Sequence, residues 1–364
     1  MSKTALVTGC GGQDGSYLCE LLLEKGYKVI GIVRRCSVNN LDRIKHIQDK
    51  LLLVEGDITD AAFINQTISR YKPDEIYNLA AMSHVGSSFA SPSSTFIMDA
   101  IGPLNILEAV RCFSEHSKVY QASTSELFGS NVTEVPVIES VADGINVCST
   151  VKYQYEGTPF SPNSPYAVAK LAAHNLVRLY RESYDIYACA GILFNHESPR
   201  RGENFVTRKI TKWIGQYKQW QNQEFKTIGR VIEDKNFIFH GIPQYGPEQF
   251  PKLKLGYIEA YRDWGHAKDY VRAMWSMMQQ DKPDDFVIST GETYTVKDFL
   301  DVAFKAANLD DWKSYVIIDP GLYRPCEVPY LCGNCSKAKA KLDWKPEYTF
   351  QTLVEEMVKN DLNG

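Results

Sequence analysis

A glycine cluster set between an apolar segment and a helical segment constrains the fold of this chain more than any other feature. Gly9, Gly12 and Gly15 directly follow the apolar run Thr4–Thr8 and precede the helical pattern of Tyr17–Leu23. Glycines at this spacing permit a tight turn, bring backbone N–H groups close to a pyrophosphate at a helix N-terminus, and let the helix pack on the strand. We therefore expect a dinucleotide-binding turn, with cofactor contacts from Gly9, Gly12, Gln13, Asp14 and Gly15.

Apolar segments and helical patterns alternate through the first half of the chain. The predicted strands are Thr4–Thr8, Lys28–Val33, Leu51–Glu55, Glu75–Leu79, Val119–Ala122, Ala188–Phe194 and Phe286–Ser289. The predicted helices include Tyr17–Leu23, Leu104–Val110 and Tyr166–Tyr184, where apolar residues recur three and four apart. This alternation predicts an α/β fold, a Rossmann-type doubly wound parallel sheet with helices on both faces.

The regular alternation ends near Asn195, and this change indicates two domains. We expect residues 1–195, rejoined by part of 255–295, to form the dinucleotide-binding domain, and residues 196–364 to form mainly a smaller α/β substrate domain. Ser140–Gly157 and Gln221–Gly256 show no sustained period and are predicted to be long irregular loops.

Composition excludes several classes of protein. A formal charge of −4 provides no basic field for nucleic acid or anionic lipid, and no segment approaches the roughly 20 apolar residues of a membrane span. Nine cysteines are scattered along the chain and are expected to be reduced thiols in a cytoplasmic protein. Cys332 and Cys335 have no second pair or nearby histidines, so we expect no metal.

The end of the second strand bears on which dinucleotide is bound. An acidic residue there would bind the ribose 2′-hydroxyl of NAD, but the sequence has Arg34 and Arg35. Two guanidiniums accommodate a 2′-phosphate and favour NADP, whereas the alternative is a solvated basic turn. Further cofactor contacts are expected behind the third and fourth strands, at Asp57, Ile58, Leu79, Ala80, Ala81 and Ser83.

A tyrosine and a lysine one helical turn apart are candidates for proton transfer. Tyr166 and Lys170 fall on one face of a predicted helix. A phenol beside a cation is more easily ionised and can take the proton of an alcohol as hydride leaves carbon. Such a pair is common by itself as one core and one surface residue, but it gains meaning behind a nucleotide-binding turn.

Thr124 and Glu126 follow the fifth predicted strand, at the edge of the sheet where ligands bind in such folds. Thr124 can hydrogen-bond a substrate hydroxyl. Simple hydride transfer needs no carboxylate there, but Glu126 can remove the proton alpha to a new ketone and so promote elimination of a neighbouring hydroxyl. The alternative is that Glu126 caps the loop.

Several stretches of this sequence together resemble the GDP-mannose 4,6-dehydratase family. They are Thr8–Tyr17, Thr124–Glu126, the Tyr166 and Lys170 pair, Gly191–Gly202, Asn204–Lys209 and Arg262–Tyr270. The resemblance covers most of the chain. It implies a bound NADP, with Tyr166 taking the proton of the sugar C4 hydroxyl, Thr124 hydrogen-bonding that hydroxyl, and Glu126 taking the C5 proton and assisting loss of the C6 hydroxyl.

The resemblance also implies further binding residues. His196 and Arg201 are expected to contact the cofactor, and Ser83, Asn195, Lys209, Arg262 and Glu327 the substrate. Arg262 and Arg324 suit the diphosphate because a guanidinium fork matches phosphate oxygens, although each can instead be a surface charge.

Departures from the family pattern leave the sugar open. Met82 replaces a residue that is usually polar, and Ser140–Gly157 and Gln221–Gly256 resemble insertions, so GDP-manno-heptose is an alternative to GDP-mannose. The same fold also serves nucleotide-sugar epimerases, which would not need Glu126. A non-enzymatic cofactor-binding paralogue is disfavoured, because the set of proton-transfer residues is intact.

The family resemblance further implies a homodimer or homotetramer. In such an assembly, Arg34, Arg35 and the following loop Cys36–Asp42 are candidates to reach a neighbour's cofactor site.

Overall fold

The computed structural model describes residues 2–35, 41–141, 145–233 and 250–363. The chain divides into two compact units, each discontinuous in sequence. Unit 1 comprises Met1–His196, Tyr261–Thr293 and Cys326–Tyr348, and unit 2 comprises Glu197–Ala260, Tyr294–Pro325 and Thr349–Gly364.

A seven-stranded parallel sheet organises unit 1, in the order β13-β8-β5-β4-β1-β2-β3. Its strands are β1 (Thr4–Thr8), β2 (Lys28–Val33), β3 (Leu52–Glu55), β4 (Glu75–Asn78), β5 (Lys118–Thr124), β8 (Ala188–Leu193) and β13 (Phe286–Ile288). The strand order reverses between β1 and β4, the position at which doubly wound sheets bind ligands. This arrangement confirms the predicted Rossmann-type fold.

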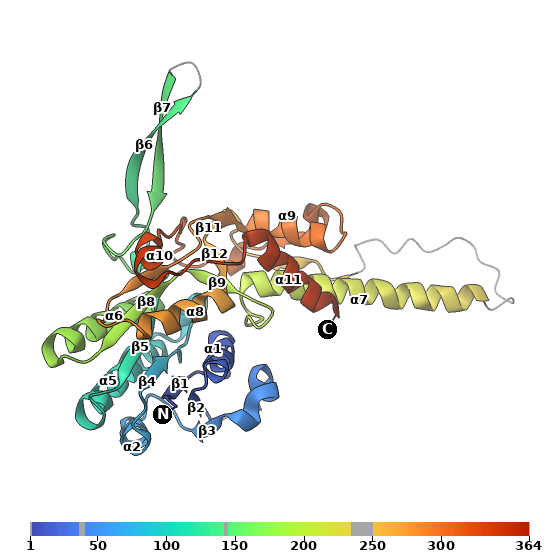
Figure 1. Cartoon of the computed structure of the whole chain (residues 1–364). Coiled ribbons are helices and arrows are strands. Elements are labelled where there is room, and N and C mark those ends of the chain that lie inside the picture. The colour runs from blue at the N-terminus through green and yellow to red at the C-terminus, as the bar shows by residue number, and fades with distance from the viewer. Residues whose placement is uncertain (1, 36–40, 142–144, 234–249, 364) are drawn as a thin grey trace. The chain divides into compact units, whose positions relative to one another are not determined.

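Helices cover both faces of this sheet (Figure 1). Ala5 and Val7 of β1 pack into a core with α1 and α8, whereas Leu6 packs into a second core with α2, α5 and α6. The alternation follows from the two-residue period of a strand, which sends successive side chains to opposite faces. These helices are α1 (Gln13–Glu24), α2 (Ala61–Tyr71), α5 (Gly102–Phe113), α6 (Pro165–Tyr184) and α8 (Ala267–Met278).

The segment Cys326–Tyr348 belongs to unit 1, although it falls within residues 196–364, which were expected to form mainly the substrate domain. Its helix α10 (Ser336–Leu342) packs against α8 and β13 of the sheet unit. Val328 and Leu331 are buried in a cluster with Phe194, next to the carboxyl end of β8. Burial of apolar side chains therefore holds this segment against the sheet of unit 1. The residues that flank the segment in the sequence do not indicate this packing.

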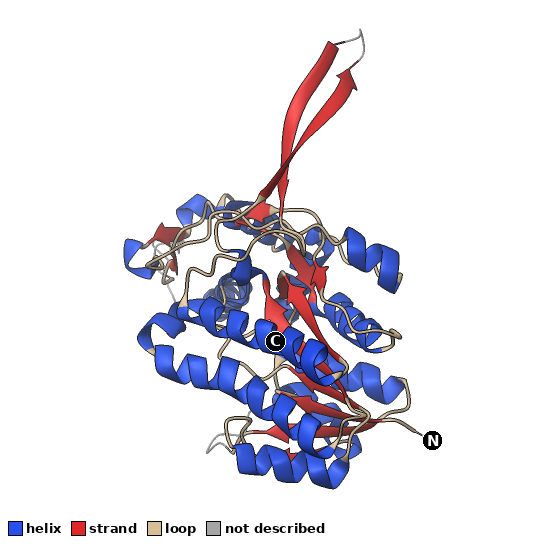
Figure 2. Cartoon of the chain, turned by 90° about the vertical axis from the view of Figure 1, so that its left-hand side faces the viewer, coloured by secondary structure: helices blue, strands red, loops and turns tan. Residues whose placement is uncertain are grey.

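The region Ser140–Gly157 is not the irregular loop that was expected. Strands β6 (Thr133–Val141) and β7 (Ile145–Tyr153) form an antiparallel hairpin, paired from Thr133 with Tyr153 to Val141 with Ile145. Figure 2 shows the hairpin extending away from the other elements of unit 1. Its β-branched residues favour a strand, but intervening polar residues hide the pattern in the sequence.

Unit 2 corrects the first part of the expected loop Gln221–Gly256. Helix α7 (Val206–Glu233) continues beyond Gln221 to Glu233, and residues 234–249 of the expected loop lie outside the described residues. Buried Arg208 on this helix forms an ion pair with Asp361 on α11. The other regular elements of unit 2 are β10 (Leu253–Leu255), β14 (Tyr294–Thr295), α9 (Val296–Ala306), η5 (Trp312–Ser314), β15 (Val316–Ile318), η6 (Pro320–Leu322) and α11 (Phe350–Asn363).

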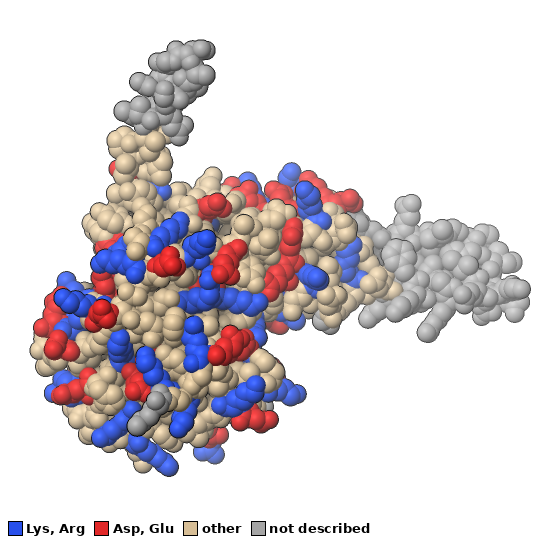
Figure 3. Space-filling view, in the orientation of Figure 1, with Lys and Arg blue, Asp and Glu red and all other residues tan. Residues whose placement is uncertain are grey.

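Short elements complete the described chain. They are η1 (Asp42–Lys50), α3 (Val85–Ala90), α4 (Pro92–Phe96), η2 (Ile97–Ile101), η3 (Ser125–Phe128), β9 (Asn195–Glu197), β11 (Tyr261–Arg262) and β12 (Trp264–His266). Among the described residues, no helix is both long and apolar enough to cross a membrane. Basic and acidic side chains are interspersed over the face shown in Figure 3.

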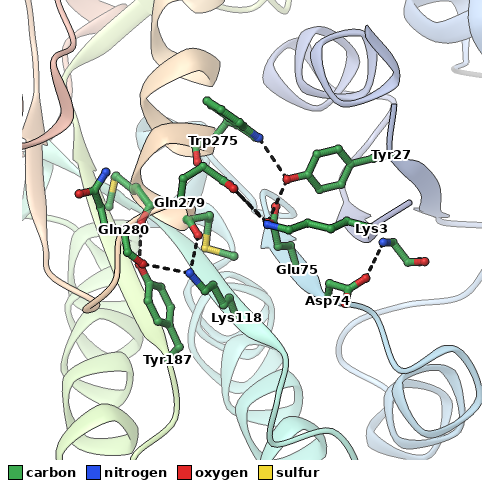
Figure 4. A network of polar contacts seen from close by, with 12 residues as sticks. Lys3, Tyr27, Asp74, Glu75, Lys118, Tyr187, Trp275, Gln279 and Gln280 are labelled. Carbon is green, nitrogen blue, oxygen red and sulfur yellow. Dashed lines mark hydrogen bonds and ion pairs between the residues drawn. The ribbon is translucent and has the colours of Figure 1, made fainter. Parts of the chain in front are cut away.

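A polar network closes the amino edge of the sheet (Figure 4). Buried Glu75, the first residue of β4, accepts hydrogen bonds from Lys3 Nζ at 2.8 Å and from the Tyr27 and Tyr77 hydroxyls at 3.0 and 2.7 Å. Lys118, the first residue of β5, donates to the carbonyl oxygen of Met278 at 2.9 Å. The charged side chains of Lys3, Glu75 and Lys118 therefore hold strand ends together, at the edge of the sheet opposite the predicted site.

Candidate active site

Hydrogen bonds tie the carboxyl ends of the central strands together. Thr8 Oγ1, at the end of β1, donates to Asn78 Oδ1 at 2.6 Å and accepts from the backbone N–H groups of Leu79 and Ala80, both at 3.0 Å. Asn78 Nδ2 in turn donates to Gln121 Oε1 on β5 at 2.7 Å. Two of the predicted cofactor residues, Leu79 and Ala80, are thus held by a threonine whose role the sequence analysis missed.

The glycine turn leaves room that side chains would fill. Gly9 has φ +67°, and a Cβ there would lie 3.0 Å from the backbone nitrogen of Ala80. A Cβ on Gly15 would lie 2.2 Å from the carbonyl oxygen of Gly9. Gly12 is the N-cap of α1 and supplies no side-chain cap, so the first N–H groups of the helix have no side-chain acceptor from this position. The turn therefore fits the pyrophosphate of a dinucleotide.

Gln13 and Asp14, at the start of α1, both contact His196, a predicted cofactor residue much later in the chain. Asp14 Oδ2 lies 2.8 Å from His196 Nε2, and His196 Nδ1 lies 2.8 Å from the Phe194 carbonyl oxygen. Gln13 Nε2 donates to the His196 carbonyl oxygen at 3.1 Å. The ring of His196 also stacks on Tyr270, with centroids 4.5 Å apart. Three of the predicted residues, Gln13, Asp14 and His196, are brought together here.

The candidates near the adenosine end are arranged less tightly. Arg34 and Arg35 are exposed beyond the end of β2. Asp57 Oδ1 accepts from the Thr59 backbone N–H and hydroxyl at 2.9 and 2.8 Å, which shapes the turn after β3. The Ile58 side chain is buried in the core, and its carbonyl oxygen accepts from Asn105 Nδ2 at 2.9 Å.

The segment after β4 continues through Ala81, Met82 and Ser83. Ala81 is half-buried and Ser83 is exposed. Met82, the departure from the family pattern, packs against the core formed by α2, α5 and α6. An apolar residue at this position is therefore accommodated inside unit 1.

Thr124 and Glu126 are held together at the end of β5. Thr124 is the N-cap of η3, and its Oγ1 accepts a hydrogen bond from the Glu126 backbone N–H at 3.3 Å. Both residues are 8% exposed. The cap is thus made by the threonine, and the Glu126 side chain is not needed for it.

Tyr166 and Lys170 lie in the first turns of α6. Ser164 caps this helix by accepting from the Ala167 N–H at 3.1 Å, and Pro165 occupies its first position. Lys170, 2% exposed, donates to the Ala122 carbonyl oxygen at 3.1 Å, and its Nζ lies 5.9 Å from the centroid of the Tyr166 ring. The bond to Ala122 places the ammonium beside β5, the strand that ends in Thr124.

Asp99 is a buried acidic residue that the sequence analysis missed. Its Oδ1 accepts from the Met82 backbone N–H at 2.8 Å. Burial raises the pKa of this carboxyl, and attraction to Lys170 acts in the opposite direction. The available sequence signal was a single acidic residue inside the otherwise apolar segment Ile97–Ile101.

Of the predicted substrate residues in unit 1, Arg262 and Glu327 form a pair. Buried Arg262 donates from Nη2 to Glu327 Oε1 at 2.7 Å and from Nη1 to the Tyr261 carbonyl oxygen at 2.8 Å. Asn195 Oδ1 is buried and makes no hydrogen bond with any described residue. An acceptor of this kind gains from a ligand donor, since an unmet buried polar atom is costly.

Three predicted residues belong to unit 2. Arg201 forms an ion pair with Glu197 at 3.0 Å and covers the ring of Phe205 at 3.6 Å from its centroid. Lys209 is half-buried near the start of α7, and Arg324 is half-buried just after η6.

The described part of the chain holds no group of three or more His, Cys, Asp or Glu side chains able to bind a metal ion. Cys332 and Cys335 are both buried free thiols. Burial raises the pKa of Cys332 to about 11, so the thiol stays protonated at neutral pH.

The strand order and glycine turn define a Rossmann-fold protein of the short-chain dehydrogenase/reductase class. Residues 6–239 and 234–357 match the profile of the family described as GDP-mannose 4,6 dehydratase. The chain belongs to this family, as the sequence motifs predicted.

Individual relatives support the assignment. The chain is 48% identical to GDP-mannose 4,6 dehydratase 1 of Arabidopsis thaliana, over 99% of this chain and 90% of the relative. It is 44% identical to GDP-mannose 4,6-dehydratase of Vibrio cholerae, over 100% of this chain and 94% of the relative. Among solved structures, dTDP-glucose 4,6-dehydratase of Bacillus anthracis, in complex with NAD, superposes with a TM-score of 0.74 at 21% identity, covering 99% of this chain and 96% of that one. This last likeness supports the fold.

Proposed function

We propose that this chain catalyses the 4,6-dehydration of GDP-mannose to a GDP-4-keto-6-deoxy sugar. The observation that carries the proposal is the pairing of Thr124 with Glu126 at the end of β5, joined through Ala122 to Lys170 and so to the helix of Tyr166. Full-length relatedness to proteins named GDP-mannose 4,6-dehydratase supports the choice of reaction. Neither of these relatives is named for a heptose, so GDP-manno-heptose has no comparable support.

The proposed cofactor is NADP, held in unit 1 by the turn Gly9–Gly15 and the segment Leu79–Ser83. Arg34 and Arg35 are proposed to bind the 2′-phosphate, because each exposes a guanidinium at the end of β2. His196 with Asp14, the backbone at Ile58, and Arg201 of unit 2 are proposed as further contacts. When bound, NADP supplies the removal of hydride from C4 and its return at C6.

The proton transfers are assigned to Tyr166 and Glu126, with Lys170 and Thr124 assisting Tyr166. Tyr166 takes the proton of the C4 hydroxyl, Lys170 stabilises the resulting phenolate, and Thr124 hydrogen-bonds the same hydroxyl. Glu126 takes the C5 proton, made acidic by the new C4 ketone, and gives a proton to the C6 hydroxyl as it leaves in water. The proton accepted by Tyr166 balances the one that C5 regains, so the net change is loss of one water.

Binding of the nucleotide sugar is assigned to the other predicted residues. Arg262, oriented by Glu327, is proposed to bind the diphosphate, with Arg324 as a second guanidinium. Asn195 offers a buried acceptor for a sugar hydroxyl. Lys209 and Ser83 are proposed to contact the substrate as well.

The experiment that tests this function is incubation of the protein with GDP-mannose and NADP, followed by detection of the keto sugar by its absorbance in base. Conversion is expected, and Glu126→Gln should lower the elimination rate by about 10²–10⁴-fold while exchange of the C4 hydrogen with the cofactor persists. Elimination at full rate in Glu126→Gln would contradict the assignment. Interconversion of sugars without loss of water would favour an epimerase instead.

A parallel assay with GDP-manno-heptose compares the two sugars. Faster turnover of the heptose would move the substrate assignment to the larger sugar and leave the chemistry at C4, C5 and C6 unchanged. A protein that turns over no GDP-sugar would favour a non-enzymatic role.

We also propose that the protein is a homodimer or homotetramer. Several large apolar side chains are exposed on the neighbouring elements α4, η2, α5 and α6 of unit 1, namely Phe96, Ile97, Ile101, Phe113, Val168 and Leu179. Apolar surface of this kind on packed helices is typical of a subunit interface. Sedimentation equilibrium checks the proposal, and a monomer at micromolar concentration would contradict it.

A further inference from the structure

A buried carboxylate next to the proposed catalytic pair has no part in the reaction described above. Asp99 lies in η2, a π-helical turn that joins α4 to α5 without a break, and its side chain is 0% exposed. The rest of this turn is Ile97, Met98, Ala100 and Ile101. A carboxylate in such surroundings destabilises the fold unless other groups compensate it, and π-helical turns occur frequently at functional sites.

One oxygen of Asp99 holds the backbone of the proposed cofactor segment. Oδ1 accepts from the Met82 N–H at 2.8 Å, in the middle of Leu79–Ser83. Oδ2 is buried and makes no hydrogen bond with the described residues. Hydrogen bonds from the described residues therefore reach only one oxygen of the Asp99 carboxylate. The negative charge of the carboxylate then acts on charged groups close to it.

The nearby charge is Lys170. The turn η2 packs against α6, and Lys170 is buried on that helix. Burial lowers the pKa of the Lys170 ammonium, and the attraction of Asp99 raises it again. The same attraction opposes the effect of burial on the pKa of Asp99. The two groups thus favour each other's charged forms.

Other titratable groups also lie on α6 or on elements packed against it. Tyr166 and His174 lie one turn to either side of Lys170 on α6 itself, and burial lowers the pKa of His174, which favours its neutral form. Glu126 lies on η3, which also packs against α6. Glu108 of α5 hydrogen-bonds Tyr180, well beyond Lys170 along the helix. Asp99 is the group whose charge acts on Lys170 in the described structure.

We propose that Asp99 is a positioning residue of the reaction, which fixes the segment Leu79–Ser83 through the Met82 amide and keeps Lys170 cationic beside Tyr166. This inference rests on the proposed function for the role of Tyr166 and Lys170. It adds a residue that acts on the cofactor segment and on the catalytic lysine at once, so that the same turn of η2 serves both.

Two variants separate the two actions. Asp99→Asn keeps an oxygen acceptor for the Met82 N–H and removes the charge, whereas Asp99→Ala removes both. Glu115→Gln, at an exposed carboxylate just after α5, is the matched control. For each protein, kcat/KM for GDP-mannose is measured from pH 6 to 10, and amide hydrogen exchange of the peptide covering Leu79–Val85 is followed without substrate.

The expected result for Asp99→Asn is that the alkaline limb of the pH profile moves to lower pH by about one unit or more, because Lys170 loses its proton more easily. Exchange at Met82 should stay slow in Asp99→Asn and become at least about tenfold faster in Asp99→Ala, where no acceptor remains. An unmoved alkaline limb in Asp99→Asn overturns the electrostatic part, and unchanged exchange in Asp99→Ala overturns the contact with Met82.

Failure of the proposed function looks different. If the wild-type protein turns over no GDP-sugar, the reaction has been misassigned, and the exchange measurement still decides the Asp99–Met82 contact. If Asp99→Ala does not fold, Asp99→Asn alone decides the electrostatic part, and its exchange at Met82 is expected to match that of the wild type.

Discussion

The imidazole of His196 contacts two acceptors at once, Asp14 Oδ2 through Nε2 and the Phe194 carbonyl oxygen through Nδ1, each at 2.8 Å. A carbonyl and a carboxylate both accept hydrogen bonds, so both contacts are made only when each ring nitrogen carries a proton. This geometry favours a protonated His196 paired with Asp14, at the N-terminus of the helix proposed to hold the pyrophosphate.

This pairing predicts the effect of removing either partner. In His196→Gln the charge is lost, and the dissociation constant for NADP should rise by about tenfold, the value of one charge-assisted hydrogen bond. Asp14→Asn should weaken binding similarly, and the double variant should be little worse than either single one. Isothermal titration measures all three. Strictly additive losses, or a histidine ring spectrum showing a single N–H for His196, would contradict the pairing.

The pair of Arg262 and Glu327 predicts a difference between binding and turnover. Glu327→Gln removes the charge that orients the guanidinium, and Arg262→Lys removes its fork but keeps the positive charge. Each should raise KM for GDP-mannose by about 10–100-fold and change kcat much less, because the diphosphate is bound alike throughout the reaction. Steady-state kinetics provide the check. A fall in kcat at constant KM would place Arg262 at the reacting carbons instead.

The buried thiol of the glycine turn should be unreactive. Burial raises the pKa of Cys10 to about 11, so at pH 8 only about one molecule in a thousand carries the thiolate. Cys112 and Cys326 are exposed and should be alkylated by iodoacetamide first. Peptide mass spectrometry after timed labelling measures the order. Labelling of Cys10 as fast as Cys112 would show that the turn opens readily in solution.

The network in Figure 4 predicts a loss of stability without a loss of chemistry. Glu75→Gln weakens the charge-assisted hydrogen bonds from Lys3, Tyr27 and Tyr77, and should lower the free energy of unfolding by about 1–3 kcal/mol in urea titrations. Activity at low denaturant should stay close to that of the wild type, because the network lies at the amino edge of the sheet. Glu115→Gln serves as the exposed control.

The same network has a predictable pH dependence. Burial by itself would lower the pKa of Lys3, but its hydrogen bond with Glu75 and the attraction between the two outweigh that effect and raise it above the ordinary 10.5. A raised lysine pKa means that the stabilisation is complete below pH 10.5 and is lost as the pH rises through the higher value of the folded state. The free energy of unfolding of the wild type should therefore fall as the pH rises above 10.5, and that of Glu75→Gln should fall less. Equal losses in both proteins would remove Lys3 from the explanation.

Most strands of the central sheet could be predicted because they are short apolar runs that are buried whichever partner lies beside them, whereas the edge strand β3 is only partly buried. The β5 and β8 segments carry this pattern strongly, and their predicted ends differ from the observed ones by no more than two residues. Prediction failed for the β6–β7 hairpin and for the extension of α7, where polar residues interrupt the period and local preference is not enough to choose an element.

The residues of the candidate site also divide into those that local spacing predicts and those that only tertiary contacts reveal. Tyr166 and Lys170 were found because four residues along a helix bring two side chains to one face. Asp99 was not found, since its effect depends on a contact with Met82, 17 residues earlier, and on packing against α6. Thr8 was recognised only as part of a motif, and its bonds to Asn78, Leu79 and Ala80 appear only once β1 and β4 are neighbours.

The sequence by itself determined the dinucleotide-binding turn, the parallel α/β sheet and the family, because these are written in local spacing and in motifs that stay contiguous. Only the tertiary structure decided which distant groups meet: His196 with Asp14, Arg262 with Glu327, and Asp99 with Met82 of the Leu79–Ser83 segment. The physical reason is that hydrogen bonds and charge attraction act over a few ångströms in space, and separation along the chain does not reveal which residues burial will bring that close.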